Sequence, residues 1–226
     1  MMQGNFEDWG IIDFNKAWDK QKYLFNLGIQ QRKTQKNLGF HDTLILCEHP
    51  HVYTLGRNSN KNNLLLHENE IETKHIKHIR IDRGGDITYH GPGQVVGYPI
   101  INLKNHGFYT KEYIHNIEEV IIRCLDKYNI KGIRLSNAPG VWLDMKHHGK
   151  TLKIASVGVR VSRFITMHGF ALNVNPDMSY YQYINPCGFN HEVMTSMEII
   201  TGKTISVKGV KSSLKQHFSR VFNLSF

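Results

Sequence analysis

Four strand-like segments follow one another closely within residues 132–175. They read "GIRLS", "GVWLDMK", "TLKIASVGVRVS" and "ITMHGFALNVN", with frequent β-branched residues. The stretch "HHGK" between the second and third segments is typical of a hairpin turn. Strands arranged in this way predict a sheet that is largely antiparallel or mixed.

Helices are predicted to flank this sheet, because three segments carry apolar residues at helical spacing. Residues 110–130 show the clearest stripe, with charges on the opposite face, and it places Cys124 in the core. In residues 14–37 the residues outside the apolar stripe are mostly polar and basic, which indicates a surface helix early in the chain. Residues 207–226 indicate a C-terminal helix. The fold class expected is α+β, in a single catalytic domain spanning residues 1–226.

Shorter strands are expected before the central helix. They have apolar, partly β-branched sequences and lie at residues 42–49, 78–82 and 94–102. Between them, residues 56–75 form a long polar loop.

Composition limits the classes of protein and partner. No run approaches 18 apolar residues, and the N-terminus lacks a signal-like segment, so we expect a cytoplasmic protein that does not span a membrane. Three widely spaced cysteines fit reduced thiols better than a disulfide framework. The net charge of +9 implies an acidic partner, and nucleic acid, anionic membrane and acidic carrier proteins all satisfy it.

The stretch "RGGDITYHGPGQ", residues 83–94, combines glycines with side chains that can do chemistry. Glycine allows a positive φ and lets a backbone approach a ligand closely. The stretch matches neither the dinucleotide-binding nor the P-loop pattern, so phosphate binding is not supported. It is read either as a loop built for backbone contact with a substrate or as a plain turn between strands.

A cysteine and a lysine are candidates for catalysis. In "INPCGF", Pro186 and Gly188 flank Cys187 in a way that can lift a thiol out of regular structure. Such a thiol needs a nearby cation to become a thiolate at neutral pH, and the alternative is a buried structural cysteine. Lys153 interrupts an apolar strand and could supply that cation and later act as a general base, unless it simply faces solvent. His90 and His168 are alternative bases.

No metal or other cofactor is expected. The chain contains 14 histidines, but no CxxC or HExxH pattern and no companion ligands at a recognised spacing.

Five segments, taken in order, closely resemble the lipoyl(octanoyl) transferases, which move an octanoyl group from acyl carrier protein to protein lysines. The segments are "EHPHVYTLGR", "RGGDITYHGPGQVVGYPI", "GVWLD", "KIASVGVRVSRFITMHGFALNV" and "INPCG". The resemblance covers about residues 48–188. It implies a biotin/lipoate protein ligase-like fold and transfer through a cysteine thioester, as the first step of endogenous lipoate synthesis.

The resemblance also assigns residues and partners. Cys187 matches the acyl-accepting nucleophile and Lys153 the lysine that lowers its pKa. The octanoyl carrier protein is the implied donor, and lipoyl domains of 2-oxoacid dehydrogenase complexes and the glycine cleavage H protein are the implied acceptors, with the enzyme as a monomer. Matched substrate-contacting positions are Arg83, Gly84, Gly85, Asp86, Ile87, Thr88, Tyr89, His90, Ser156, Val157, Gly158, Gly169, Phe170 and Ala171.

Two other functions stay open on the residues alone. An ATP-dependent lipoate or biotin ligase shares the implied fold but has no need of an acyl cysteine. A basic nucleic-acid-binding module fits the charge, but the sequence has no helix-turn-helix, zinc finger or RNA-binding signature.

Overall fold

The computed structural model describes residues 1–65, 76–145, 150–186 and 193–226. In these residues, a seven-stranded sheet with strand order β2-β3-β7-β11-β10-β9-β8 forms the centre of the molecule. Neighbouring strands are antiparallel, except that β2 runs parallel to β3. The strands are β2 (Asn5–Ile11), β3 (Thr43–Glu48), β7 (Gln94–Ile100), β8 (Ile133–Leu135), β9 (Ala138–Met145), β10 (Lys150–Ser162) and β11 (Ile165–Asn173).

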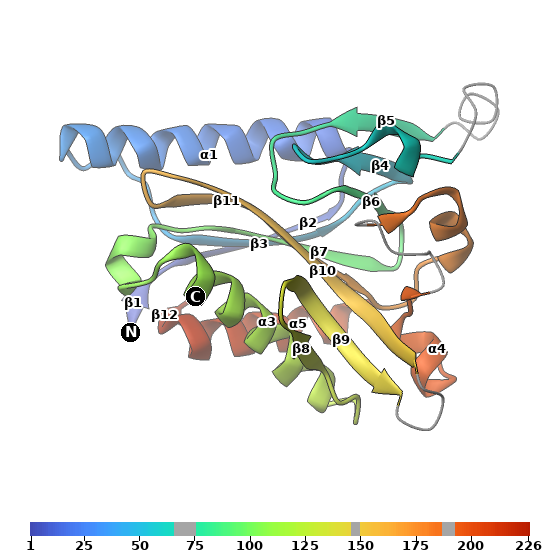
Figure 1. Ribbon diagram of the computed structural model, residues 1–226. Coiled ribbons are helices and arrows are strands. Elements are labelled where there is room, and N and C mark those ends of the chain that lie inside the picture. The colour runs from blue at the N-terminus through green and yellow to red at the C-terminus, as the bar shows by residue number, and fades with distance from the viewer. Residues whose placement is uncertain (66–75, 146–149, 187–192) are drawn as a thin grey trace.

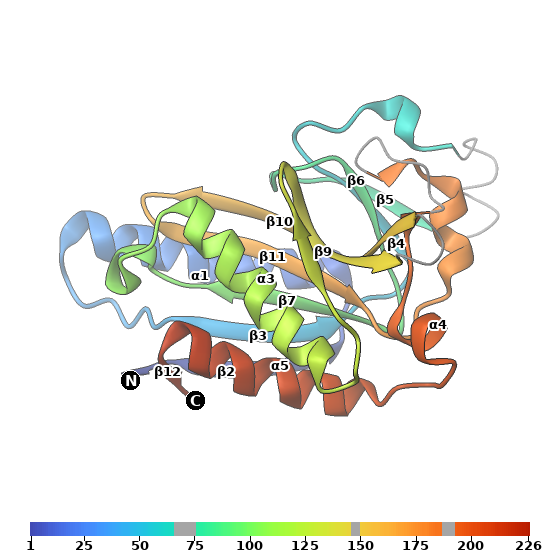
Figure 2. The same cartoon turned by 60° about the horizontal axis from the view of Figure 1, so that its bottom comes forward.

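Helices cover both faces of this sheet. Figure 1 shows α1 (Phe14–Thr34) along one face, and α3 (Thr110–Asp126) and α5 (Val207–Phe222) along the other. After rotation, α3 and α5 lie side by side in front of the sheet (Figure 2). The larger apolar core lies between these two helices and the sheet, and a smaller one lies under α1.

A second, three-stranded sheet sits beside one end of the main sheet, with strand order β5-β4-β6. Its strands are β4 (Val52–Leu55), β5 (Lys77–Arg80) and β6 (Ile87–His90). One face packs on apolar residues of the segment containing Tyr181 and Ile184. The remaining elements are β1 (Met2–Gln3), β12 (Leu224–Ser225), α4 (Met197–Thr201) and the short 3₁₀ helices η1 (Lys61–Asn63), η2 (Leu103–His106) and η4 (Met178–Tyr183).

The predicted fold class is confirmed, since the sheets are mixed and mostly antiparallel and helices flank them. The predicted helices and strands are present with shifts of a few residues at their ends. The buried face of α1 differs in part, because Tyr23 is 69% exposed whereas Gln21, Phe25 and Gly28 are buried. The "HHGK" turn falls mostly on residues 146–149, outside the described residues.

The reading of residues 83–94 as one continuous loop was wrong. Residues 87–90 form strand β6, which pairs antiparallel with β4. The strand is only four residues long and has glycines close to both ends, so its strand pattern is hidden in the sequence. None of the helices within the described residues is both long and apolar enough to span a membrane.

Candidate active site

A cavity lies where the small sheet meets the middle of the main sheet. Its volume is about 50 Å³. Most of the predicted substrate-contacting residues line it, together with Lys153. These lining residues are Arg83, Gly85, Thr88, His90, Ser156, Val157, Gly158, Gly169, Phe170 and Ala171.

One wall of the cavity is residues 81–86, which we call the strap because it crosses β10. The Gly84 amide donates a 2.9 Å hydrogen bond to the Val159 carbonyl of β10. A Cβ on Gly158 would lie only 3.0 Å from the Gly84 oxygen, and Gly85 has a φ of +85°. Glycine is therefore used here at least partly for close packing of the strap on the strand.

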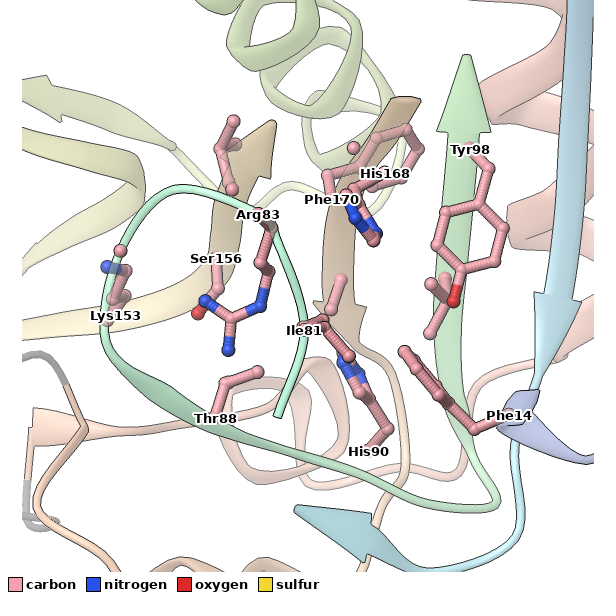
Figure 3. Close-up of a pocket in the computed structure, with 16 residues that line it drawn as sticks. Phe14, Ile81, Arg83, Thr88, His90, Tyr98, Lys153, Ser156, His168 and Phe170 are labelled. Carbon is pink, nitrogen blue, oxygen red and sulfur yellow. The ribbon is translucent and has the colours of Figure 1, made fainter. Parts of the chain in front are cut away.

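Arg83 extends from the strap into the cavity region. Its Nη2 donates to the carbonyl oxygen of Thr54 at 2.7 Å and to the Thr54 hydroxyl at 3.0 Å. In Figure 3 the guanidinium lies between Ser156 and Thr88, on the side of the cavity where Lys153 is also found. This side of the cavity therefore carries positive charge.

Strand β6 sends alternate side chains to opposite sides, as a strand must. Thr88 and His90 line the cavity. Ile87 and Tyr89 instead pack in the apolar cluster of the small sheet.

Two further predicted residues do not line the cavity and serve local structure. The Asp86 carboxylate accepts a hydrogen bond from the Ile87 amide at 2.7 Å, and Gly84 holds the strap on β10. Together with Ile87 and Tyr89, these residues support the wall of the cavity from behind.

A β-bulge places Lys153 in the cavity. The pairing of β10 with β9 shifts between Lys153 and Ala155, and Ile154 and Ala155 both lie in the larger core. Because two successive residues point to the core, Lys153 and Ser156 both line the cavity, although strict alternation would put them on opposite faces.

Lys153 is buried, with 4% of its surface exposed, so the alternative of a solvent-facing lysine is wrong. Its Nζ lies 4.9 Å from the centre of the Trp142 ring. Its backbone oxygen accepts a 2.9 Å hydrogen bond from the Thr195 amide.

The two candidate histidines are held by different partners. His90 Nδ1 lies 2.7 Å from the Gln94 side-chain oxygen, and burial lowers the pKa of His90 to about 3, so its ring is neutral. His168 Nε2 lies 2.7 Å from Asp82 in the strap. Burial lowers the pKa of His168 although the Asp82 carboxylate opposes this. His90 is therefore a poor general base, and His168 is already tied to the strap.

Cys187 lies outside the described residues. The other two cysteines are fully buried, as the sequence predicted for Cys124. Burial raises the pKa of the Cys124 thiol to about 11 and that of Cys47 further. Neither thiol has the electrostatic setting of a nucleophile.

Several lining residues were missed by the sequence reasoning. Phe14 comes from the start of α1, Ile81 from the strap, and Val96 and Tyr98 from β7. The segment "QVVGYPI" carries the two β7 residues within a motif, so alternation along it was an available signal. Nothing in the sequence around Phe14 links it to the cavity. In Figure 3, Phe14 and Tyr98 lie at the side away from Lys153.

Comparison with known proteins identifies the family. The model of the lipoyl protein ligase A/B catalytic domain matches residues 16–219. An octanoyltransferase of Cytophaga hutchinsonii is 43% identical over 224 residues, covering 96% of this chain and 92% of the relative. An octanoyltransferase of Bacteroides fragilis is 45% identical over 207 residues, covering 92% of each. The chain belongs to the octanoyltransferase family. It is therefore an acyltransferase.

Solved structures agree on the fold of this octanoyltransferase family member. A bi-partite lipoate protein ligase from Thermoplasma acidophilum has a TM-score of 0.73 at 12% identity, covering 100% of this chain and 86% of the ligase. The biotin protein ligase of Aquifex aeolicus has a TM-score of 0.52 at 14% identity, covering 99% and 70%. The predicted biotin/lipoate protein ligase-like fold is confirmed.

Proposed function

We propose that this protein transfers an octanoyl group from octanoyl-acyl carrier protein to a lysine of a lipoyl domain, through a thioester on Cys187. The acceptors are the lipoyl domains of 2-oxoacid dehydrogenase complexes and the glycine cleavage H protein, and the reaction begins lipoate cofactor synthesis. Sequence relatives named octanoyltransferase support octanoyl as the acyl group that is transferred. The net charge of +9 suits an acidic carrier protein.

The observation that carries the proposal is the two-sided cavity. Lys153 and Arg83 provide positive charge on one side, and Phe14 and Tyr98 provide aromatic surface on the other. An octanoyl chain has about six methylenes, whose burial is worth about 5 kcal/mol at about 0.8 kcal/mol each. The charged side of the cavity suits the reactive carbonyl of an acyl thioester, and the aromatic side suits the apolar acyl chain.

In the first half-reaction, the Cys187 thiolate attacks the carbonyl carbon of the carrier thioester. A new carbon–sulfur bond forms to Cys187, the bond to the carrier sulfur breaks, and the carrier thiolate takes a proton from the Lys153 ammonium. The Arg83 guanidinium favours the negative charge that develops on the carbonyl oxygen. Lys153 is then neutral.

In the second half-reaction, the amine of the lipoyl-domain lysine attacks the Cys187 thioester. An amide bond forms, Cys187 leaves as a thiolate, and neutral Lys153 takes the proton that the amine loses. The ammonium–thiolate pair is restored. One thioester is thus exchanged for another of similar energy, and conversion to the amide is downhill.

The test is transfer without ATP. Octanoyl-acyl carrier protein and a lipoyl domain are mixed with the enzyme, and octanoylation of the domain lysine is followed by mass spectrometry. We expect transfer at a rate that ATP does not change. Transfer only from free octanoate with ATP would instead identify a ligase, the activity named for the structural neighbours.

A further inference from the structure

Trp142 and Lys153 face each other directly across strands β9 and β10. They are register partners, and the Lys153 Nζ lies 4.9 Å from the centre of the Trp142 ring. Both residues are buried, with 2% and 4% of their surfaces exposed. A cation within about 6 Å of an indole face is attracted by its negative quadrupole, most strongly where water is excluded.

The same strand fixes both the indole and the lysine stem. The Trp142 Nε1 donates a 2.9 Å hydrogen bond to the Ala138 carbonyl. Gly140 has a φ of +128°, and a Cβ there would lie 2.7 Å from Lys153 Cε and 2.4 Å from the Ala155 oxygen. The lysine stem therefore packs directly on a position that only glycine can occupy without displacement.

Other charged groups surround this pair on the described elements. Behind Gly140, the Glu118 carboxylate accepts a 2.8 Å hydrogen bond from the Gly140 amide and pairs with Arg134 at 3.3 Å. Arg83 in the strap is positive, and its charge disfavours a second cation in the cavity. His90 is neutral there. A buried ammonium in this setting gains from the indole face.

We propose that Trp142 is a positioning residue that holds the Lys153 ammonium through its indole face and thereby sets how readily Lys153 releases its proton. The inference rests on the proposed function, in which Lys153 gives a proton to the carrier thiolate and later takes one from the acceptor amine. A weaker indole contact makes the ammonium release its proton more easily, and makes neutral Lys153 a weaker base.

The experiment measures Lys153 directly in the enzyme without substrate. The protein is labelled with [ε-¹³C]lysine, the Cε resonance of Lys153 is assigned with Lys153→Arg, and its shift is followed with pH. Trp142→Leu should lower the pKa of Lys153 by about one unit. Trp142→Phe keeps an aromatic face and should lower it less.

The chain provides a control pair whose residues do not line the cavity. Lys22 Nζ lies 4.5 Å from the Trp18 ring centre, and the Lys22 side chain is 43% exposed. Trp18→Leu removes this lysine–indole contact and should leave the titration of Lys153 unchanged. A changed pKa of Lys153 in Trp18→Leu would mean that the Lys153 resonance responds to general changes in the fold and not to the Trp142 contact.

Fluorinated tryptophans test the same contact without a change of shape, so the test survives if Trp142→Leu does not fold. Fluorine withdraws electron density from the ring face and so weakens its attraction for the ammonium. The pKa of Lys153 should therefore fall stepwise with the number of fluorine atoms. An unchanged pKa across this series would overturn the proposal. Failure of the proposed function is a separate result, seen as absence of octanoyl transfer by the wild-type enzyme.

Discussion

The amide of Thr195 donates a 2.9 Å hydrogen bond to the carbonyl oxygen of Lys153. The adjacent Met194 also forms a parallel bridge with Lys153. These contacts join the strand that carries the lysine to the chain that follows Cys187 in sequence. The wide sequence separation of the proposed nucleophile and its lysine is thus no obstacle to a shared site, and this supports the mechanism proposed above.

Removal of the Lys153 charge should make Cys187 less reactive. In Lys153→Ala, iodoacetamide alkylation of Cys187 should slow at pH 7 and approach the wild-type rate at pH 9, because a thiol without a cation has a pKa of about 8.5. Peptide mass spectrometry gives the extent of alkylation. An unchanged pH profile would exclude the ammonium–thiolate pair.

Lys153→Arg should separate the two roles of the lysine. Arginine keeps the positive charge but does not release its proton at neutral pH. We expect the octanoyl-enzyme to form more slowly, because the carrier thiolate must then take its proton from water, and to persist when the lipoyl domain is added. Rapid loss of the acyl group to the domain would show that another base serves the second step.

The three cysteines should differ sharply in their importance. Cys187→Ser should lose nearly all transfer with little change in thermal unfolding, because a serine hydroxyl is not ionised at neutral pH. Cys124→Ala and Cys47→Ala should keep transfer at temperatures where they are folded, since both thiols are buried and have raised pKa values. If Cys124→Ala lost octanoyl transfer and Cys187→Ser kept it, the nucleophile would be Cys124 and the assignment would be wrong.

Acid should destabilise the fold, because burial keeps two histidines neutral. It lowers the pKa of His49 to about 4 and that of His90 to about 3. Below pH 6.5 the unfolded chain binds protons at both residues and the folded chain does not, so the free energy of unfolding falls as pH falls. Each histidine adds up to about one proton to this slope between about pH 6 and 5.

Urea unfolding between pH 7 and 5 measures that slope. His49→Gln removes one of the two groups. It should reduce the pH dependence of the free energy of unfolding by about one proton, whatever the effect of the substitution on stability at pH 7. An equal slope in the variant would show that His49 is not kept neutral by the fold.

Gly97→Ala should disturb the acyl end of the cavity. Gly97 pairs with Phe170 across β7 and β11, and a Cβ on Gly97 would lie 2.2 Å from the ring Cζ. The ring lines the cavity and must move, at a cost of about 1–3 kcal/mol. We expect kcat/KM to fall more for octanoyl than for hexanoyl carrier protein.

Gly209→Ala is the matched control for this change. In α5, a Cβ on Gly209 meets its neighbours at 3.4 Å or more, so alanine should be neutral or stabilising. Equal selectivity for the two acyl lengths in Gly97→Ala and Gly209→Ala would contradict a role of Phe170 in the acyl pocket.

The sequence predicted the elements whose apolar period is long and regular. Strands β9 to β11 and helix α3 are of this kind, and each was found within a few residues. Strands β4 and β6 were missed because four residues between glycines and prolines carry too little pattern. The parallel strand β2 was missed because its pairing with β3 depends on tertiary contacts that no local pattern records.

The residues of the candidate site likewise divide into those that the sequence predicts and those that only the folded chain reveals. Arg83 and Lys153 could be found because they lie in segments that resemble the family. The bulge that turns Lys153 and Ser156 to the same side depends on the pairing of β10 with β9, and a single strand sequence does not reveal it. Phe14 reaches the cavity because α1 packs across the sheet, so only the folded chain reveals it.

Intact-protein mass spectrometry after mixing the enzyme with octanoyl-acyl carrier protein, without ATP and without a lipoyl domain, tests the central claim most directly. We predict an added octanoyl group that maps to Cys187, is released by hydroxylamine, and is absent in Cys187→Ser. A wild-type enzyme that transfers octanoate to lipoyl domains yet never carries the acyl group on Cys187 would contradict the account.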